Sequence, residues 1–330
     1  MNPPPRATRP PDAGPRPRDL RRAFPVAPAL RPRALRPGSR IALLAPAGPV
    51  EPERLERSRD RCRALDLEPV VFPAANARHG YLAGSDAARL ADLQAAFDDP
   101  SVDGIWALRG GYGTLRILDA LDLARQHADP VPFIGFSDNT SVHARHAELG
   151  VISFHGPHPG ADFPPATEES FRRVLFSPEA PGALVCRADD PPPRTLVPGR
   201  VEAPLVGGNL AILASMCGAR HMLDARGCIL FLEDVGEPAY RVDRMLLQLH
   251  RSGLTKDVVG LALGRFTEPP EGDPNLVIDV LAELAERLGV PTVADLPFGH
   301  VPHNCTLPVG GRALLDADGA ALVLTEAAVR

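Results

Sequence analysis

Lysine, tryptophan and long apolar runs are what this chain of 330 residues most clearly lacks. Lys256 is the only lysine and Trp106 the only tryptophan, so nearly every positive charge is an arginine. No apolar run approaches the roughly eighteen residues of a membrane-spanning helix, so we expect no membrane partner. The composition, 44% hydrophobic and 23% charged, is ordinary for a soluble protein of one large or two medium domains.

Cysteine is also sparse, and no two cysteines have the spacing of a C-x-x-C pair. Two of them lie in apolar runs, and we interpret all of them as reduced, mostly small core residues. Free thiols suit a reducing compartment, so the pattern predicts a cytoplasmic protein. The cysteines are Cys62, Cys186, Cys217, Cys228 and Cys305.

Acidic residues and large apolar side chains are scarce in residues 1–37. This segment has nine arginines against Asp12 and Asp19, a net charge of +7, whereas the rest of the chain carries −12. Because it is also dense in proline, we predict a disordered basic tail. Aromatic residues do not alternate with the arginines, so we predict no nucleic-acid partner. Arg21 and Arg22 faintly resemble an export signal, but the apolar stretch after them is short and contains prolines.

Strand-like and helix-like segments alternate through residues 38–160. The alternation predicts an α/β fold, with a mostly parallel sheet flanked by helices, in which ligands bind at the carboxyl ends of the strands. Predicted strands lie within 38–48, 68–72, 104–108, 133–136 and 151–154, and predicted helices at 52–65, 85–98, 115–121 and up to about 149.

A second region begins near Val201. We predict that 38–160 is an N-terminal α/β domain, that the irregular stretch 161–200 is a linker, and that 201–330 is a C-terminal mixed α/β domain. The linker is expected to contain a helix near 167–176. In the second domain we predict strands at 228–232, 259–264 and 293–296, two short terminal strands, and helices at 240–249 and 276–288.

Ser137 follows the apolar run Phe133–Phe136 and precedes residues that start helices well. A serine at such a sharp turn can point its hydroxyl into a cleft, as in a nucleophile elbow. The Gly-x-Ser-x-Gly motif is incomplete, because Asn139 occupies the second glycine position. On this segment alone, the commoner interpretation is that Ser137 caps a helix.

A nucleophilic serine needs a base and an acid that orients the base. His300 follows a predicted strand in a loop framed by proline and glycine, although it also reads as a surface histidine. Glu233 ends an apolar strand and can accept the imidazole N–H. The commoner alternative for it is an ion pair with Arg241 or Arg244.

The glycine-rich loop Arg109–Gly113 lets backbone approach a ligand closely. An N–H of Gly110 or Gly111, together with that of Asp138, can form an oxyanion hole. The alternative is a phosphate-binding loop, but the spacing matches no nucleotide motif.

His155, His158 and Asp162 can be read as a metal cluster. Their spacing falls in a loop rather than on a helix, and no second cluster accompanies them, so we predict no metal.

Seven short segments, taken in order, resemble the LD-carboxypeptidase family. This family of serine peptidases includes muramoyltetrapeptide carboxypeptidases and microcin C self-immunity peptidases. The resemblance runs from about Gly38 to the end of the chain, and no single segment carries it. The segments are Arg109–Gly113, Gly135–Asp138, His155–Pro157, Gly207–Leu210, Leu232–Asp234, Tyr240–Met245 and Phe298–His300, the last followed by Leu307 and Pro308.

The resemblance implies a catalytic triad in which Ser137 is the nucleophile, Glu233 the acid and His300 the base. It implies an active site between two domains, no cofactor, a peptide substrate and a homodimer. The expected reaction is cleavage of an L,D peptide bond that releases the terminal D-alanine of murein tetrapeptide.

Substrate choice is less constrained. We predict Arg109, Tyr112 and Asn209 as substrate-binding residues, Arg109 as a donor to the substrate carboxylate. Asn139 and the segment Cys217–Ala219 depart from the family pattern, which leaves the substrate open. The alternatives are hydrolysis of a peptide–nucleotide conjugate, as in the immunity branch, and a catalytically silent module that binds a ligand through the Arg109–Gly113 loop.

Overall fold

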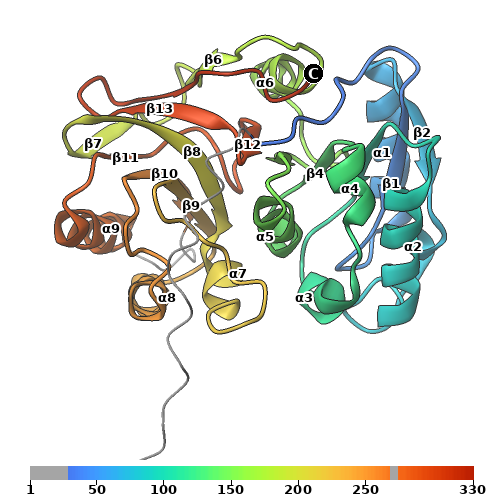
Figure 1. The fold of residues 1–330 in the computed structure, drawn as a ribbon, viewed down its shortest axis with the longest axis horizontal. Coiled ribbons are helices and arrows are strands. Elements are labelled where there is room, and N and C mark those ends of the chain that lie inside the picture. Colours follow the sequence, from blue (N-terminus) through green and yellow to red (C-terminus); the bar gives the residue numbers. More distant parts are fainter. Residues whose placement is uncertain (1–28, 268–273) are drawn as a thin grey trace, which may run out of the picture.

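The computed structural model describes residues 29–267 and 274–330, which form two sheets flanked by helices (Figure 1). The predicted mixed α/β class is confirmed. The 85–98 helix shows how local sequence sets an element: Ser85 accepts a hydrogen bond from the Ala88 N–H and starts α2 (Asp86–Asp98).

The first sheet has the strand order β12-β5-β4-β3-β1-β2. Strands β1 to β5 are mutually parallel, and β12 pairs antiparallel with β5. The strands are β1 (Arg40–Leu44), β2 (Glu68–Val71), β3 (Gly104–Ala107), β4 (Phe133–Gly135), β5 (Ser153–His155) and β12 (Leu307–Val309). The helices are α1 (Pro52–Ala64), α2, α3 (Thr114–Ile117), α4 (Ala124–Ala128) and α5 (Thr140–Glu148), with 3-10 turns at Pro73–Asn76 (η1), Leu118–Ala120 (η2) and Ser137–Asn139 (η3).

The second sheet has the order β6-β14-β13-β8-β9-β10-β11-β7. Its centre, β8 to β11, is parallel, and both edges are antiparallel. The strands are β6 (Gly182–Ala183), β7 (Arg194–Val197), β8 (Arg200–Asn209), β9 (Ile229–Val235), β10 (Gly260–Thr267), β11 (Thr292–Ala294), β13 (Arg312–Asp316) and β14 (Ala321–Leu324). The helices are α6 (Pro165–Leu175), α7 (Leu210–Ser215), α8 (Ala239–Ser252) and α9 (Pro274–Leu288).

The two sheets dock through α5, which lies between them (Figure 1). Val142 of α5 belongs to the same buried apolar cluster as Val206 of β8 and Leu210 of α7. The docked arrangement brings the carboxyl ends of β4 and β8 to one place, because Gly208 of β8 packs directly against Thr140 at the start of α5.

Three segments cross the predicted domain ranges. Strand β12 comes from the C-terminal range but extends the N-terminal sheet, and β6 and β7 of the predicted linker form the edges of the second sheet. Of the predicted tail, residues 1–28 lie outside the described residues. Residues 29–37 lie against the folded chain, since the Leu30 N–H donates to Gly150 O at 2.7 Å and Leu35 is 2% exposed.

Strand β8 was not predicted, although it is the longest of the described strands. Its carboxyl end contains Gly207 and Gly208, which weaken the strand pattern in the sequence. Gly207 is required there, because a Cβ at this position would lie 1.9 Å from the Phe231 carbonyl oxygen. No helix in the described part of the chain is both long enough and apolar enough to cross a bilayer.

Candidate active site

Ser137 lies at the turn between β4 and α5, as the sequence predicts. Its φ is +62°, in the left-handed region that side chains other than glycine rarely adopt. Neither η3 nor α5 begins with a side-chain cap, so the hydroxyl of Ser137 does not serve as a helix cap. A strained serine that caps nothing is a feature that commonly accompanies function.

The Arg109–Gly113 loop packs against Ser137. A Cβ at Gly110 would lie 2.8 Å from the Ser137 Cβ and 2.9 Å from its Oγ, so only glycine allows this approach. The loop is held from behind by the Gly48 N–H, which donates to Gly110 O at 3.0 Å. Within the described chain, the N–H groups of Gly110 and Gly111 donate to no protein acceptor, so both are available to a ligand.

His300 and Glu233 form a hydrogen-bonded pair, with 2.7 Å between His300 Nδ1 and Glu233 Oε2. Glu233 is fully buried on β9, whereas the His300 side chain is 20% exposed. Because the carboxylate accepts, Nδ1 carries a proton, and in the neutral imidazole Nε2 is left as an acceptor. The alternative, an ion pair of Glu233 with Arg241 or Arg244, is wrong. Arg241 pairs with Glu237, Arg244 lies over the Tyr240 ring, and the partner of Glu233 among the described ion pairs is His300.

The pKa of His300 is raised above 6.5. Burial opposes the charged imidazolium, but the hydrogen bond and charge of Glu233, with the charge of Asp234, outweigh it. The pair therefore favours protonated His300 more than solvent would.

Phe136 connects the serine turn to this pair, because its ring centroid lies 4.7 Å from that of His300. A second link runs through Asn209, which is opposite Glu233 in the β8–β9 register and whose N–H donates to Thr140 Oγ1 at 3.0 Å. The three triad candidates thus come from neighbouring strand ends of two docked sheets. No hydrogen bond joins Ser137 to His300 among the described residues.

Asn209, a predicted substrate-binding residue, is engaged within the protein. Its Nδ2 donates to Asp234 Oδ1 at 3.0 Å, and its Oδ1 accepts from the Ile212 N–H and caps α7. Burial raises the pKa of Asp234 to about 6, helped by the charge of Glu233 and opposed by N–H donors from Val235, Asn209 and Ala211. Asp234 adjoins Glu233 in the sequence, but its link to Asn209 needs the β8–β9 pairing.

Arg109 and Tyr112, the other predicted substrate-binding residues, lie beside the serine turn. Arg109 Nη1 donates to Pro49 O at 2.8 Å. Tyr112 is 46% exposed and forms an edge-to-face pair with Tyr81, which is 66% exposed, with 5.8 Å between ring centroids. Sequence reasoning missed Tyr81, because nothing in the local pattern pairs two tyrosines 31 positions apart.

His155 and His158, the histidines of the rejected metal cluster, have different surroundings. His158 Nδ1 donates to Ala107 O at 2.9 Å, and burial lowers the pKa of His158 to about 3. His155 is fully buried against the rings of Phe136 and Phe231. Asp162 is exposed. Among the residues that the structure describes, no three or more His, Cys, Asp or Glu side chains are grouped to hold a metal.

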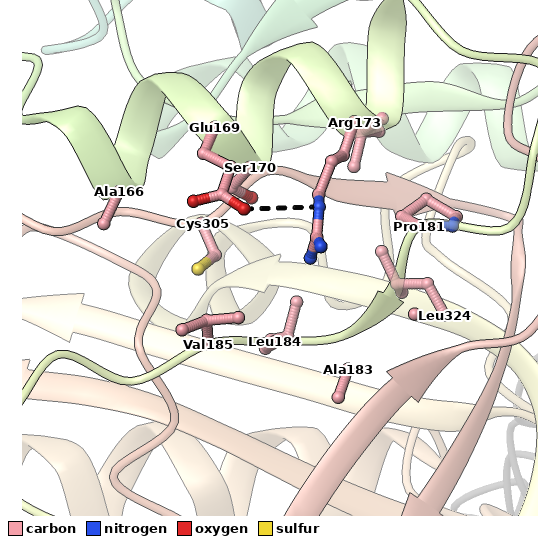
Figure 2. Close-up of a pocket in the computed structure, with 12 residues that line it drawn as sticks. Ala166, Glu169, Ser170, Arg173, Pro181, Ala183, Leu184, Val185, Cys305 and Leu324 are labelled. Carbon is pink, nitrogen blue, oxygen red and sulfur yellow. Dashed lines mark ion pairs between the residues drawn. The ribbon is translucent and has the colours of Figure 1, made fainter.

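A separate hollow lies between α6 and β6 (Figure 2). It is lined by Cys305 and by an ion pair between Glu169 and Arg173, whose Oε1 and Nε are 3.5 Å apart. Burial raises the pKa of the Cys305 thiol to about 12, so this cysteine stays protonated and is a poor nucleophile. None of the candidate active-site residues lines this hollow.

These features are typical of a serine hydrolase: a strained serine at a strand end, a glycine loop packed against it, and a carboxylate–imidazole pair supplied by the other sheet. Comparison with known proteins gives the family. The family model of the LD-carboxypeptidase N-terminal domain matches residues 41–156, and the family model of the C-terminal domain matches residues 202–315. The chain belongs to the LD-carboxypeptidase family and is a serine-type LD-carboxypeptidase.

Relatives and solved structures agree with this family. A Streptomyces coelicolor protein, provisionally named a carboxypeptidase, is 45% identical over 91% of this chain and 97% of its own. The murein tetrapeptide carboxypeptidase of Pseudomonas aeruginosa is 37% identical over 84% of this chain and 94% of its own.

The crystal structure of muramoyltetrapeptide carboxypeptidase from Oxalobacter formigenes has a TM-score of 0.77 and 36% identity, and the match covers 88% of this chain and 99% of that one. The self-immunity protein MccF, bound to glutamyl sulfamoyl guanosine, has a TM-score of 0.82 at 23% identity over 91% of this chain and all of its own, which shows a shared fold.

Proposed function

We propose that this carboxypeptidase cleaves the L,D peptide bond of murein tetrapeptide and releases the terminal D-alanine during peptidoglycan recycling. Two relatives whose names specify this substrate class support the proposal, at 36% and 37% identity. The observation that carries it is Ser137 in a left-handed turn against Gly110, next to the hydrogen-bonded pair of Glu233 and His300.

In the proposed mechanism, Ser137 Oγ attacks the scissile carbonyl while His300 Nε2 takes its proton. Glu233 holds the imidazole in the required tautomer and stabilises the imidazolium. The N–H groups of Asp138 and of Gly110 or Gly111 bind the oxyanion. His300 then protonates the leaving amine of D-alanine, and water hydrolyses the acyl-enzyme.

Replacing the nucleophile tests the proposal most directly. The Ser137→Ala variant is expected to fold normally and to lose about 10³-fold or more of its kcat/KM for an L,D-tetrapeptide. The assay is mass spectrometry of a purified muropeptide pool, in which the tetrapeptide mass should fall by that of one alanine residue, because hydrolysis adds one water. Full activity in a pure Ser137→Ala preparation would contradict the assignment of Ser137 as the nucleophile. A muropeptide pool left unchanged by the wild-type enzyme would contradict the assignment of tetrapeptide as the substrate.

A second substrate class, peptide–nucleotide conjugates, is favoured by one observation. The exposed pair of Tyr81 and Tyr112 offers an aromatic surface on which a nucleobase can stack. The fold shared with MccF, which was solved with a sulfamoyl nucleoside, is consistent with this class. Faster turnover of an aspartyl-adenylate analogue than of tetrapeptide would favour it, and the Tyr81→Ala variant should then lose that preference.

The family resemblance also leads us to propose a cytoplasmic homodimer. Light scattering on the eluting peak of a sizing column gives the mass directly, and fractionation of expressing cells gives the location. A mass near the monomer's 35.2 kDa would contradict the dimer.

A further inference from the structure

Arg54 and Arg109 have no acidic partner among the described residues. None of the ion pairs formed by the described residues involves Arg54, in the first turn of α1, or Arg109, in the glycine loop. The carboxylates Glu51 and Glu56 of the α1 region are paired with other arginines, Arg78 and Arg59. A protein that leaves two neighbouring guanidinium groups unneutralised has capacity to bind an anion.

Contacts place Arg109 beside Ser137, and they place Arg54 against the loop that follows His158, whose ring centroid lies 4.5 Å from that of Phe136. Gly110, which follows Arg109, packs on the Ser137 side chain, and Arg109 donates to Pro49 O in the segment that leads into α1. Arg54 passes along Gly160, where a Cβ would lie 2.6 Å from the Arg54 Cγ.

The electrostatic effects among these groups agree with their proximity. Burial lowers the pKa of Arg54, and the positive charges of Arg109 and then Arg57 lower it further. The Arg54 Nε is buried without a hydrogen-bond partner. Burial lowers the pKa of His158, and the positive charges of Arg54, His300 and Arg109 lower it further, which agrees with the contacts that bring the His158 and His300 rings against Phe136. An anion between the arginines would remove this like-charge repulsion.

We propose that Arg54, together with Arg109, binds the free α-carboxylate of the last residue of the peptide substrate. The inference rests on the proposed function and deepens it, because it names the group that makes the enzyme an exopeptidase. A carboxylate receives charge-assisted hydrogen bonds from the guanidinium pair, whereas a neutral amide or a continuing chain leaves both charges unpaired. The N-terminus of α1 adds favourable potential for an anion.

The test measures binding without catalysis. The Ser137→Ala variant is titrated calorimetrically with tetrapeptide ending in D-alanine and with the same peptide ending in D-alaninamide. We expect the acid to bind about tenfold or more tightly than the amide. Adding Arg54→Gln should bring the two affinities to within about threefold, while Arg54→Lys should retain part of the preference.

Arg63→Gln is the matched control, because Arg63 lies on the same helix in an exposed pair with Asp60. It should leave the acid-to-amide ratio unchanged. The unfolding midpoint of Arg54→Gln without peptide should not fall, since the substitution removes repulsion, and a lower midpoint would indicate a structural role instead.

The failures of the two proposals are distinguishable. If wild-type enzyme releases D-alanine but Arg54→Gln keeps the full preference for the acid, or if Ser137→Ala binds acid and amide equally, the carboxylate site is overturned and the proposed function stands. If Ser137→Ala binds neither peptide and wild type cleaves neither, the proposed function is overturned and the inference with it.

Discussion

The two halves of the proposed active site are held by different forces. On the N-terminal side, Ser137 is fixed by backbone conformation, with a positive φ and a glycine packed against it. On the C-terminal side, Glu233 and His300 are fixed by one hydrogen bond between side chains in a buried setting. The first arrangement depends on shape and the second on charge, so substitutions and pH should affect them differently.

A substitution in the charge-dependent half, Glu233 and His300, should cause the largest loss of activity. Glu233→Gln keeps the shape but removes the carboxylate that holds the His300 tautomer, so kcat/KM for tetrapeptide should fall by about 10³- to 10⁴-fold. Steady-state kinetics with a circular-dichroism check of folding measure it. Loss of less than about tenfold would mean that Glu233 does not orient the base.

The shape-dependent half should respond to a single methyl group. Gly110→Ala places a Cβ against Ser137 and should lower kcat/KM about 100-fold by displacing the proposed nucleophile, with no change in the pH profile. Gly319→Ala is the control, because its nearest neighbour at 3.2 Å is a side-chain oxygen of Asp316 in a remote turn. Equal effects of the two alanines would contradict a specific contact at Ser137.

The pH dependence of kcat/KM should distinguish the charge-dependent half from the shape-dependent half. A base must be neutral, so kcat/KM should rise with pH through a pKa above 6.5. In Glu233→Gln, the midpoint of the residual activity should move to lower pH, whereas in Gly110→Ala it should stay. An acid limb centred below 6.5 in the wild type would contradict the raised pKa.

The free energy of unfolding should also depend on the pKa of His300. Because its folded-state pKa is raised above the unfolded value, the contribution of the charged pair is fully present below about pH 6.5 and is lost as pH rises through the folded pKa. Denaturant titrations across this window should show the wild type losing more stability with rising pH than Glu233→Gln does.

The smallest effect concerns backbone strain. Ser137→Gly should raise the free energy of unfolding by up to about 1 kcal/mol, because glycine adopts a φ of +62° without a Cβ clash. Ser137→Ala keeps the Cβ and should leave stability nearly unchanged. A destabilised Ser137→Gly would mean that the hydroxyl makes a structural contact that outweighs the strain.

The difference between the halves also decided what could be predicted. The turn at Ser137 was predicted because a short apolar run followed by helix-starting residues is a local signal. The pairing of His300 with Glu233 was reached through the family resemblance, since 67 positions separate them. Tyr81 and Arg54 were missed, because their relation to the glycine loop depends on contacts between distant segments.

Sequence alone determined most of the local elements: the helix capped by Ser85, the apolar strands other than β8, and the Arg109–Gly113 loop in which backbone approaches closely. Tertiary structure decided which strand joins which sheet, as for β12, and which polar residues meet, as for Asn209 with Asp234. The physical reason is the distance along the chain over which each interaction acts. Propensity and periodicity act over a few neighbours, whereas strand pairing and buried hydrogen bonds depend on which distant segments exclude water together.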